Sequence, residues 1–347
     1  MAGPTHDFAR PSPFAAGEGS ARARVAQAGS EADASLRVGV IYNPRSHRNR
    51  GQDLDVATRP NIFVAQPRER SELPGVLEDF ARRGIDYLVI NGGDGTVRDV
   101  LSSGHHVYGE NWPRLAVLPK GKTNALNVDL GAPADWNLVD ALEAIGRGHV
   151  VTRRPVTIGP VSGTGPTIHG FILGAGAFTI GIRAGQDAHR YGAFNSLAVA
   201  VTAFWGVAQA LFGSDSNIWR RGIGMRIRLD AELRDMAHSG HGDPARRELL
   251  FASTLERFPA GLKPFGPEKR GLKLTVIDKP RRRIVGMLPL VVLAGYRPRW
   301  LYRAGLHQLG ADSFEIELDD QFILDGEAFP AGHYRVEQGP ALDFIVP

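Results

Sequence analysis

The chain of 347 residues contains no cysteine. This absence excludes disulfide bonds and thiolate metal sites, and it suits a reducing compartment. Residues 1–35 also lack an apolar run after a basic start, so we expect no secretory signal. They are rich in Ala, Gly, Ser, Pro and Arg without a repeating period, which is typical of a disordered leader.

Charge of neither sign dominates the sequence. It has 41 Lys and Arg residues against 37 Asp and Glu residues, a formal net charge of +4. This small excess fits phosphate-bearing partners or an anionic membrane surface, and it also fits plain solubility. No aromatic and basic residues interleave as a platform for bases, so we expect no nucleic-acid partner.

Predicted strands and helices alternate over residues 36–150, which indicates an α/β domain with a mostly parallel sheet. The predicted strands are 38–42, 62–65, 85–91 and 114–118, and the predicted helices are 71–83, 125–130 and one containing Leu138, Leu142 and Ile145. The turns at 43–46, 91–96 and 119–124 each follow a strand. Ligands of parallel sheets bind beyond the carboxyl ends of the strands. We therefore expect these three turns to line one crevice.

Residues 151–347 show a different pattern, with many short strands separated by Gly and Pro. This pattern predicts an antiparallel sandwich or barrel, and we expect a β-sandwich domain. The expected strands include 225–229, 249–255, 272–277, 289–293, 314–318, 334–336 and 342–346. As an alternative, the C-terminal segment returns to the first domain and belongs to it.

Residues 194–212 carry no charge, and their length approaches the roughly 20 apolar residues of a membrane span. Asn195, Ser196, Thr202 and Gln209 dilute the stretch. We favour a helix buried between domains over a helix at a lipid surface, and a true span is the least favoured alternative. Cationic clusters would attract anionic headgroups, although such charges more often form an ordinary solvated face. The basic residues in question are Arg220, Arg221, Arg226, Arg228, Arg281, Arg282 and Arg283.

The turn Gly92-Gly93-Asp94-Gly95-Thr96 stands between a predicted strand and a helix. Its glycines let the backbone approach an anion, and the N-terminus of a helix favours phosphate. Beside a phosphate, Asp94 is tolerable only with a metal ion, a proton or a mechanistic role. A tight turn without a ligand is the alternative.

Two familiar phosphate motifs are excluded. Gly121-Lys122-Thr123 lacks the earlier glycine of a P-loop, because Ala116 stands there. The dinucleotide-binding pattern fails because Arg98 stands where its last glycine is required.

Asp325-Gly326-Glu327 follows the apolar run 322–324. Two such acids suit Mg²⁺, and a carboxylate can also accept the proton of an attacking hydroxyl. An ordinary hairpin turn is the more frequent explanation of this triplet.

Taken in order, these motifs resemble the diacylglycerol kinase catalytic-domain family of soluble bacterial lipid kinases, which is related to sphingosine and ceramide kinases. The matching segments are 43–46, 92–101, 118–124, 129–133, 324–327 and 341–347. The first glycine turn alone is shared with NAD kinases, and the later motifs favour the lipid branch.

The resemblance implies a nucleotide domain followed by a lipid-receiving β-sandwich, with ATP and Mg²⁺ as cofactors. The acceptor would be a hydroxyl of a diacylglycerol-like, sphingoid or ceramide lipid at the inner face of the cytoplasmic membrane. Asp94, Asp325 and Glu327 would be catalytic, and Asp325 and Glu327 would also hold metal. The implied nucleotide-binding residues are Asn43, Ser46, Gly92, Gly93, Gly95, Thr96, Thr123 and Asn124. Which carboxylate is the base and which a metal ligand stays open, and a homodimer is compatible with the sequence.

The sequence departs from the family at two places. Lys122 interrupts the usual Gly-Thr-Gly-Asn turn, and residues 176–185 lack the usual Asp of a Gly-Phe-Asp motif. An NAD kinase-like phosphotransferase and a non-catalytic lipid- or nucleotide-binding regulator are the alternative functions.

Overall fold

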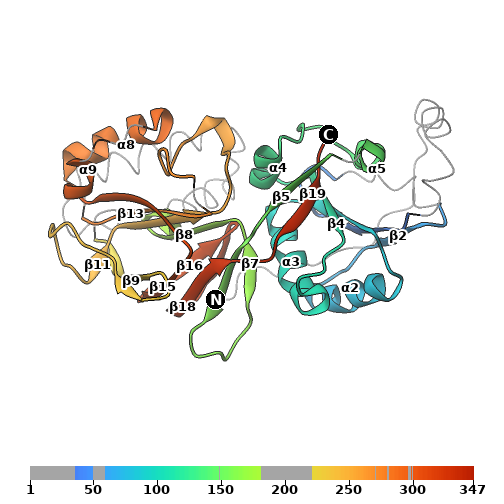
Figure 1. Cartoon of the computed structure of the whole chain (residues 1–347), viewed down its shortest axis with the longest axis horizontal. Helices are drawn as coiled ribbons and strands as arrows, with labels where there is room; N and C mark the ends of the chain where they lie inside the picture. The colour runs from blue at the N-terminus through green and yellow to red at the C-terminus, as the bar shows by residue number, and fades with distance from the viewer. Residues whose placement is uncertain are drawn as a thin grey trace. The chain divides into compact units, whose positions relative to one another are not determined.

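The computed structural model describes residues 36–49, 59–147, 149–180, 221–269, 271–279, 281–295, 298 and 300–347. The predictions for residues 1–35 and 194–212 lie outside these ranges. The chain forms two compact units (Figure 1). Unit 1 runs to Pro155 and also includes Pro340–Pro347, and unit 2 is Val156–Gly339.

Unit 1 contains one mixed sheet of six described strands, in the order β2-β1-β3-β4-β19-β5. The strands are β1 (Val38–Tyr42), β2 (Ile62–Ala65), β3 (Tyr87–Gly92), β4 (Arg114–Pro119), β5 (Val150–Arg153) and β19 (Leu342–Ile345). All neighbours are parallel except β5, which runs antiparallel to β19. The mostly parallel α/β sheet is therefore confirmed, and the last strand of the chain pairs with β4 in this sheet.

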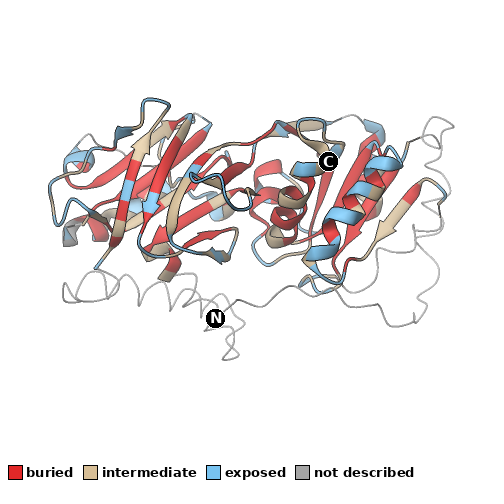
Figure 2. Ribbon diagram, turned by 90° about the horizontal axis from the view of Figure 1, so that it is seen from below, coloured by how far each residue is buried: buried red, intermediate tan, exposed pale blue. Residues whose placement is uncertain are grey.

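Unit 1 has five helical segments among the described residues, and two of them, α2 and α5, bury one face and leave the other in water (Figure 2). The five segments are η3 (Arg70–Glu72), α2 (Leu73–Arg82), α3 (Asp94–Tyr108), α4 (Ala125–Leu130) and α5 (Leu138–Arg147). In α2, the buried side chains are Leu73, Leu77 and Phe80. β1 and β3 are buried along their whole length, as expected for strands covered on both faces.

The described residues of unit 2 form two antiparallel sheets. The first has the order β10-β9-β15-β18-β6-β7, with β11 beside β9. Its strands are β6 (Val156–Pro160), β7 (Ile168–Gly170), β9 (Ile223–Leu229), β10 (Arg234–Asp235), β11 (Arg246–Arg247), β15 (Ser313–Leu318) and β18 (Gly332–Gln338). The second has the order β14-β13-β12-β8-β16-β17. Its strands are β8 (Ile172–Gly176), β12 (Leu249–Ser253), β13 (Leu272–Ile277), β14 (Leu306–Ala311), β16 (Phe322–Leu324) and β17 (Glu327–Phe329).

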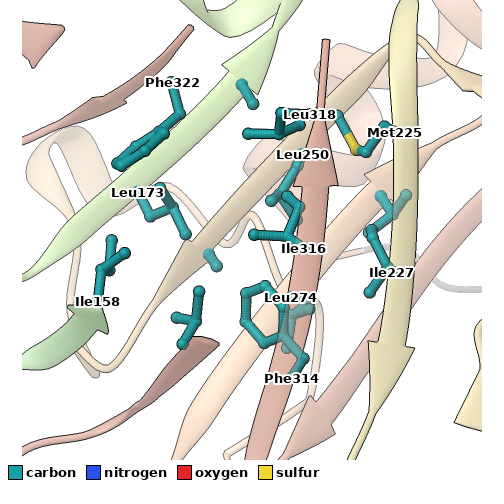
Figure 3. Close-up of a cluster of buried hydrophobic side chains, with 14 of the residues drawn as sticks. Ile158, Leu173, Met225, Ile227, Leu250, Leu274, Phe314, Ile316, Leu318 and Phe322 are labelled. Carbon is teal, nitrogen blue, oxygen red and sulfur yellow. The ribbon is translucent and has the colours of Figure 1, made fainter. Parts of the chain in front are cut away.

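Side chains from both sheets of unit 2 share one apolar core (Figure 3). Phe314, Ile316 and Leu318 alternate along β15 and enter this core, as do Leu272 and Leu274 of β13. This period of two is that of strands with one face against a second sheet. The predicted antiparallel β-rich second half is confirmed.

The predicted strand 289–293 is wrong. These residues lie in the helix α8 (Arg282–Ala294), which is followed by α9 (Trp300–Arg303). Ile284, Leu288 and Val291 recur at helical spacing and pack in an apolar cluster that includes Ile277 of β13. Tertiary packing thus favours the helix over the strand propensity of the short apolar run. Among the described residues, no helix is long and apolar enough to cross a bilayer.

Candidate functional site

Three loops of unit 1 meet at the carboxyl ends of β1, β3 and β4. The Asn43 side chain, just after β1, donates a hydrogen bond from Nδ2 to Oγ1 of Thr96 in α3 over 2.9 Å. The backbone N–H of Arg48 donates to the carbonyl of Lys120 over 3.0 Å. These contacts join the first loop to the other two, so the three turns lie together; that they line a ligand crevice stays a prediction.

The second and third loops touch through two glycines. A Cβ atom on Gly93 would lie 2.7 Å from the Cα of Gly121, and a Cβ on Gly121 would lie equally close to the Cα of Gly93. No side chain larger than hydrogen fits there without moving backbone. Glycine at both positions therefore allows the backbones of the two loops to pack directly against each other.

Asp94 is the first residue of α3, and its carboxylate faces the start of α4. The backbone N–H groups of Leu126, Ala125 and Asn124 lie near enough to this carboxylate to favour its charged form. Burial raises the pKa of the Asp94 carboxyl, and these N–H groups oppose the rise without cancelling it. Asp94 thus links the glycine turn to the third loop, and its carboxyl, whose pKa is raised, lies between them.

Asn124 shapes the third loop from within. Its backbone is left-handed, with φ 50° and ψ 48°, a conformation that asparagine tolerates better than most residues. Its Oδ1 accepts from the N–H of Gly121 over 2.7 Å, and its Nδ2 donates to the carbonyl of Gly121 over 3.0 Å. The amide therefore closes the loop, while Thr123 and Lys122 stay exposed.

The other predicted nucleotide-binding residues lie in the same loops. The N–H of Ser46 donates to the carbonyl of Asn43 over 3.2 Å, so Ser46 belongs to the turn that Asn43 begins. A Cβ on Gly92 would lie 2.5 Å from the Thr96 side chain, so this glycine lets Thr96 pack against the end of β3. Gly95 stands between Asp94 and Thr96 in the first turn of α3.

Sequence analysis missed a buried ion network behind this turn. The Arg98 guanidinium lies 2.7 Å from Oδ1 of Asp99, and Nε of Arg70 lies 2.8 Å from Oδ2 of the same carboxylate. Arg98 and Asp99 are both buried. Two adjacent charges in a helix whose neighbours Val97 and Val100 are apolar were the signal that could have revealed it.

Arg45, His47, Arg48 and Lys122 are exposed on the first and third loops. Sequence analysis weighed only Lys122. Together these side chains supply cationic and hydrogen-bonding groups around the glycine turn, an arrangement that suits a phosphate-bearing ligand.

In unit 2, Asp325 and Gly326 form the two-residue turn of the β16–β17 hairpin, with Leu324 paired to Glu327. Both have positive φ, 46° and 83°, as a type I′ turn requires. The Asp325 carboxylate accepts the N–H groups of Phe171, at 3.0 Å, and of Ile172, at 2.9 Å. The carboxylate thus anchors the hairpin to the start of β8.

The described residues of unit 2 do not by themselves form a metal centre. Both carboxylate oxygens of Asp325 already accept backbone N–H groups. Glu327, the first residue of β17, is half-buried. Among the described residues, no three His, Cys, Asp or Glu side chains gather closely enough to hold a metal ion.

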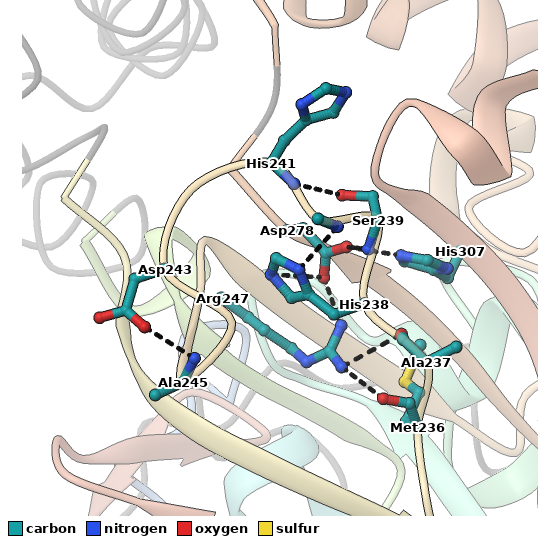
Figure 4. Close-up of polar contacts among 11 residues, drawn as sticks. Met236, Ala237, His238, Ser239, His241, Asp243, Ala245, Arg247, Asp278 and His307 are labelled. Carbon is teal, nitrogen blue, oxygen red and sulfur yellow. Dashed lines mark hydrogen bonds and ion pairs between the residues drawn. The ribbon is translucent and has the colours of Figure 1, made fainter.

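A second polar cluster in unit 2 surrounds Asp278 (Figure 4). The carboxylate pairs with Arg247, accepts from Nε2 of His307 over 2.8 Å, and accepts the N–H of Ser239 over 2.8 Å. Burial raises the pKa of Asp278, but these hydrogen bonds and the charges of His307 and Arg247 outweigh it and lower the pKa to about 2. Arg247 also donates to the carbonyl of Met236. The cluster fastens the segment after β10 to β13 and β14, which is a structural role.

Unit 1 is similar to proteins of known family. The family model described as "Diacylglycerol kinase catalytic domain" matches residues 37–158, which include all three loops and Asp94. This part of the chain is therefore similar to the diacylglycerol kinase catalytic domain family. A search of curated proteins finds no match for the chain.

Two solved structures are similar to this chain over most of its length. A diacylglycerol kinase from Bacillus anthracis is similar over 90% of this chain and 97% of its own, with a TM-score of 0.58 and 16% identity. A second structure from the same organism, provisionally described as a diacylglycerol kinase, has the same coverage, a TM-score of 0.61 and 17% identity. At such low identity these likenesses show the fold alone.

Proposed function

We propose that the chain is an ATP-dependent lipid kinase, which transfers the γ-phosphate to a hydroxyl of a diacylglycerol-like, sphingoid or ceramide lipid. One observation carries the proposal. In a diacylglycerol kinase catalytic domain, three loops converge on a glycine turn that holds a carboxyl of raised pKa, Asp94. Phosphoryl transfer needs such a combination of bare backbone and a proton acceptor.

The loops supply the groups that a nucleotide triphosphate needs. Gly93 and Gly95 leave the backbone accessible, and α3, a helix of 15 residues, begins at this turn with no side-chain hydrogen bond from its N-cap residue Gly93. Asn43 and Thr96 hold each other, so the edge of the turn is rigid before a nucleotide binds. Phosphate would lie on the turn, with the exposed cations of the neighbouring loops reducing its charge.

Asp94 would accept the proton of the attacking lipid hydroxyl. A raised pKa brings a carboxylate closer to the acidity at which proton transfer is efficient near neutral pH. The three N–H groups from the start of α4 keep the carboxylate in one orientation. This proposal needs no step through a metal. Mg²⁺ is the expected counter-ion of the ATP phosphates, and Asp325 acts as a structural residue of unit 2.

The acceptor decides between this function and its alternatives. Purified chain is incubated with γ-labelled ATP and with diacylglycerol, sphingosine, ceramide or NAD in separate reactions, each in the same detergent micelles. Label in one of the lipids supports the proposal and names the acceptor class. Label in NAD alone would replace the proposal with an NAD kinase-like activity. Binding of ATP without label in any acceptor would favour a non-catalytic regulator, which would act peripherally at the inner face of the membrane.

A further inference from the structure

Large apolar side chains are exposed together on one part of unit 2. On α8, Leu290 and Leu293 are 51% and 58% exposed, and on α9, Trp300 and Tyr302 are 40% and 52% exposed. Leu262 is also exposed, and its neighbour Lys263 donates a backbone hydrogen bond to the carbonyl of Val292 in α8. We call these five side chains the α8–α9 face. Only two other large apolar side chains among the described residues are comparably exposed.

The sequence of α8 explains why this face exists. The helix is apolar on both sides: Ile284 and Val291 pack on the β13–β14 side, whereas Leu290 and Leu293 point away from that cluster. Figure 1 shows α8 and α9 beside β13. A helix that is apolar all round is typical of a position with apolar surroundings on every side, in a protein core or in lipid. Protein covers one side of α8, and the other side is exposed.

The charged residues in the segment that contains α8 and α9 are all basic. Residues 279–311 contain seven Lys and Arg residues and no Asp or Glu, whereas the whole chain has a net charge of only +4. Arg303 and Lys263 are exposed beside the apolar side chains. A surface that combines leucines with Trp, Tyr and cations matches the interface of an anionic bilayer, where the rings and the long basic side chains lie between hydrocarbon and headgroups.

The face is also hollowed. Trp300, Tyr302 and Arg303 border a cavity of about 800 Å³ that continues over Leu306 and Gln308. Mobile lipid chains and headgroups adapt to such a hollow, which favours a bilayer over a rigid protein surface.

We propose that the α8–α9 face docks unit 2 onto anionic lipid bilayers, with the leucines and Trp300 entering the headgroup boundary and Arg303 contacting lipid phosphate. The biological meaning of this docking rests on the proposed lipid kinase function. The docking itself does not, because it requires neither nucleotide nor phosphoryl transfer.

The test is co-sedimentation of the full chain with vesicles, without ATP. One set of vesicles is pure phosphatidylcholine, and the other contains equal parts of phosphatidylcholine and phosphatidylglycerol. We expect binding to the anionic vesicles that weakens with salt. The triple variant Leu290→Ser/Leu293→Ser/Trp300→Ser should bind on the order of a hundredfold more weakly, because three apolar side chains no longer enter the boundary.

Two matched controls make the test specific. Val161→Ser removes an apolar side chain elsewhere in unit 2 that is as exposed as Trp300, and it should leave binding unchanged. Arg303→Gln should weaken binding to anionic vesicles alone, whereas Arg335→Gln, an exposed arginine on β18, should not. Circular dichroism and the thermal unfolding midpoint show that each variant is folded.

The outcomes separate this inference from the kinase proposal. Failure of the wild-type chain to bind anionic vesicles would overturn the docking, even if it phosphorylates lipid in micelles. Equal binding by the folded triple variant would overturn it too. Conversion of a dimer into a monomer by the triple variant, without vesicle binding, would make the face a subunit interface and overturn the proposal. Vesicle binding by a chain without kinase activity would leave the docking intact and reject the proposed function alone.

Discussion

The contact between Gly93 and Gly121 gives the sharpest structural prediction, because alanine at position 93 changes nothing else. Gly93 has φ −94° and ψ −177°, an extended conformation that alanine adopts freely. The added Cβ would lie 2.7 Å from the Gly121 Cα, whereas carbon atoms in contact prefer about 3.5–4.0 Å. Gly93→Ala must therefore push the two loops apart by about 1 Å.

Two effects of that displacement can be measured. Overpacking of this kind costs about 1–3 kcal/mol, which should lower the free energy of unfolding in urea. A misplacement of about 1 Å at a reacting centre can cost on the order of 10²-fold in rate, which should reduce turnover of labelled ATP with the acceptor lipid.

Gly75→Ala is the matched control. Gly75 lies exposed in α2, and a Cβ there would meet nothing within 4 Å. Since alanine favours helix over glycine by about 0.5–1 kcal/mol, this variant should be slightly more stable and fully active. Wild-type stability and turnover in Gly93→Ala would refute the close approach of the two loops and the phosphate site that depends on it.

Two further predictions concern unit 2. Asp325→Ala removes the acceptor of the Phe171 and Ile172 N–H groups, so we expect it to lower the free energy of urea unfolding by about 1–3 kcal/mol; an unchanged value would refute the anchoring role. The pKa of Asp278 is lowered to about 2 in the folded chain. The ionised carboxylate therefore adds about 2 kcal/mol to the free energy of unfolding at pH values above its unfolded pKa, and this stabilisation is lost as the pH falls from about 4 to 2. Asp278→Asn should remove this part of the acid dependence. The measurement is the free energy of urea unfolding at a series of pH values, with His307→Gln as a second variant. An identical pH profile in both variants and the wild type would contradict the prediction.

Most strands and helices of both units can be predicted from the sequence, because the buried apolar residues recur with the spacing typical of a strand or a helix. Residues 38–42 and 62–65 are strands with the expected bounds, since continuous apolar runs between turn residues suit a parallel sheet covered on both faces. The alternation from Phe314 to Leu318 likewise places three side chains in the core between two sheets.

Prediction from the sequence is wrong or incomplete where contacts between residues far apart in the sequence determine the structure. Residues 289–293 form too short an apolar run to distinguish strand from helix, and packing of Ile284 and Val291 against Ile277 settles the choice. The same limit applies to side-chain roles. The sequence motif marks Asp325 as a candidate site residue. Its hydrogen-bond donors, the N–H groups of Phe171 and Ile172, lie more than 150 positions earlier in the chain.

For the glycine turn, the sequence identifies the loops but not their mutual contacts. Neither the packing of Gly93 on Gly121 nor the direction of the Asp94 carboxylate toward α4 follows from spacing. Both depend on how β3 and β4 align in the sheet, which brings Gly92 opposite Pro119.

The central claim is that Asp94 takes part in phosphoryl transfer, and Asp94→Asn tests it most directly. Asparagine keeps an oxygen for the N–H groups of α4, so the loops should stay in place while the proton acceptor is lost. With labelled ATP and the acceptor lipid, we predict a fall in kcat of about 10²–10⁴-fold with nearly unchanged ATP affinity. Wild-type kcat in a folded Asp94→Asn variant would contradict the account.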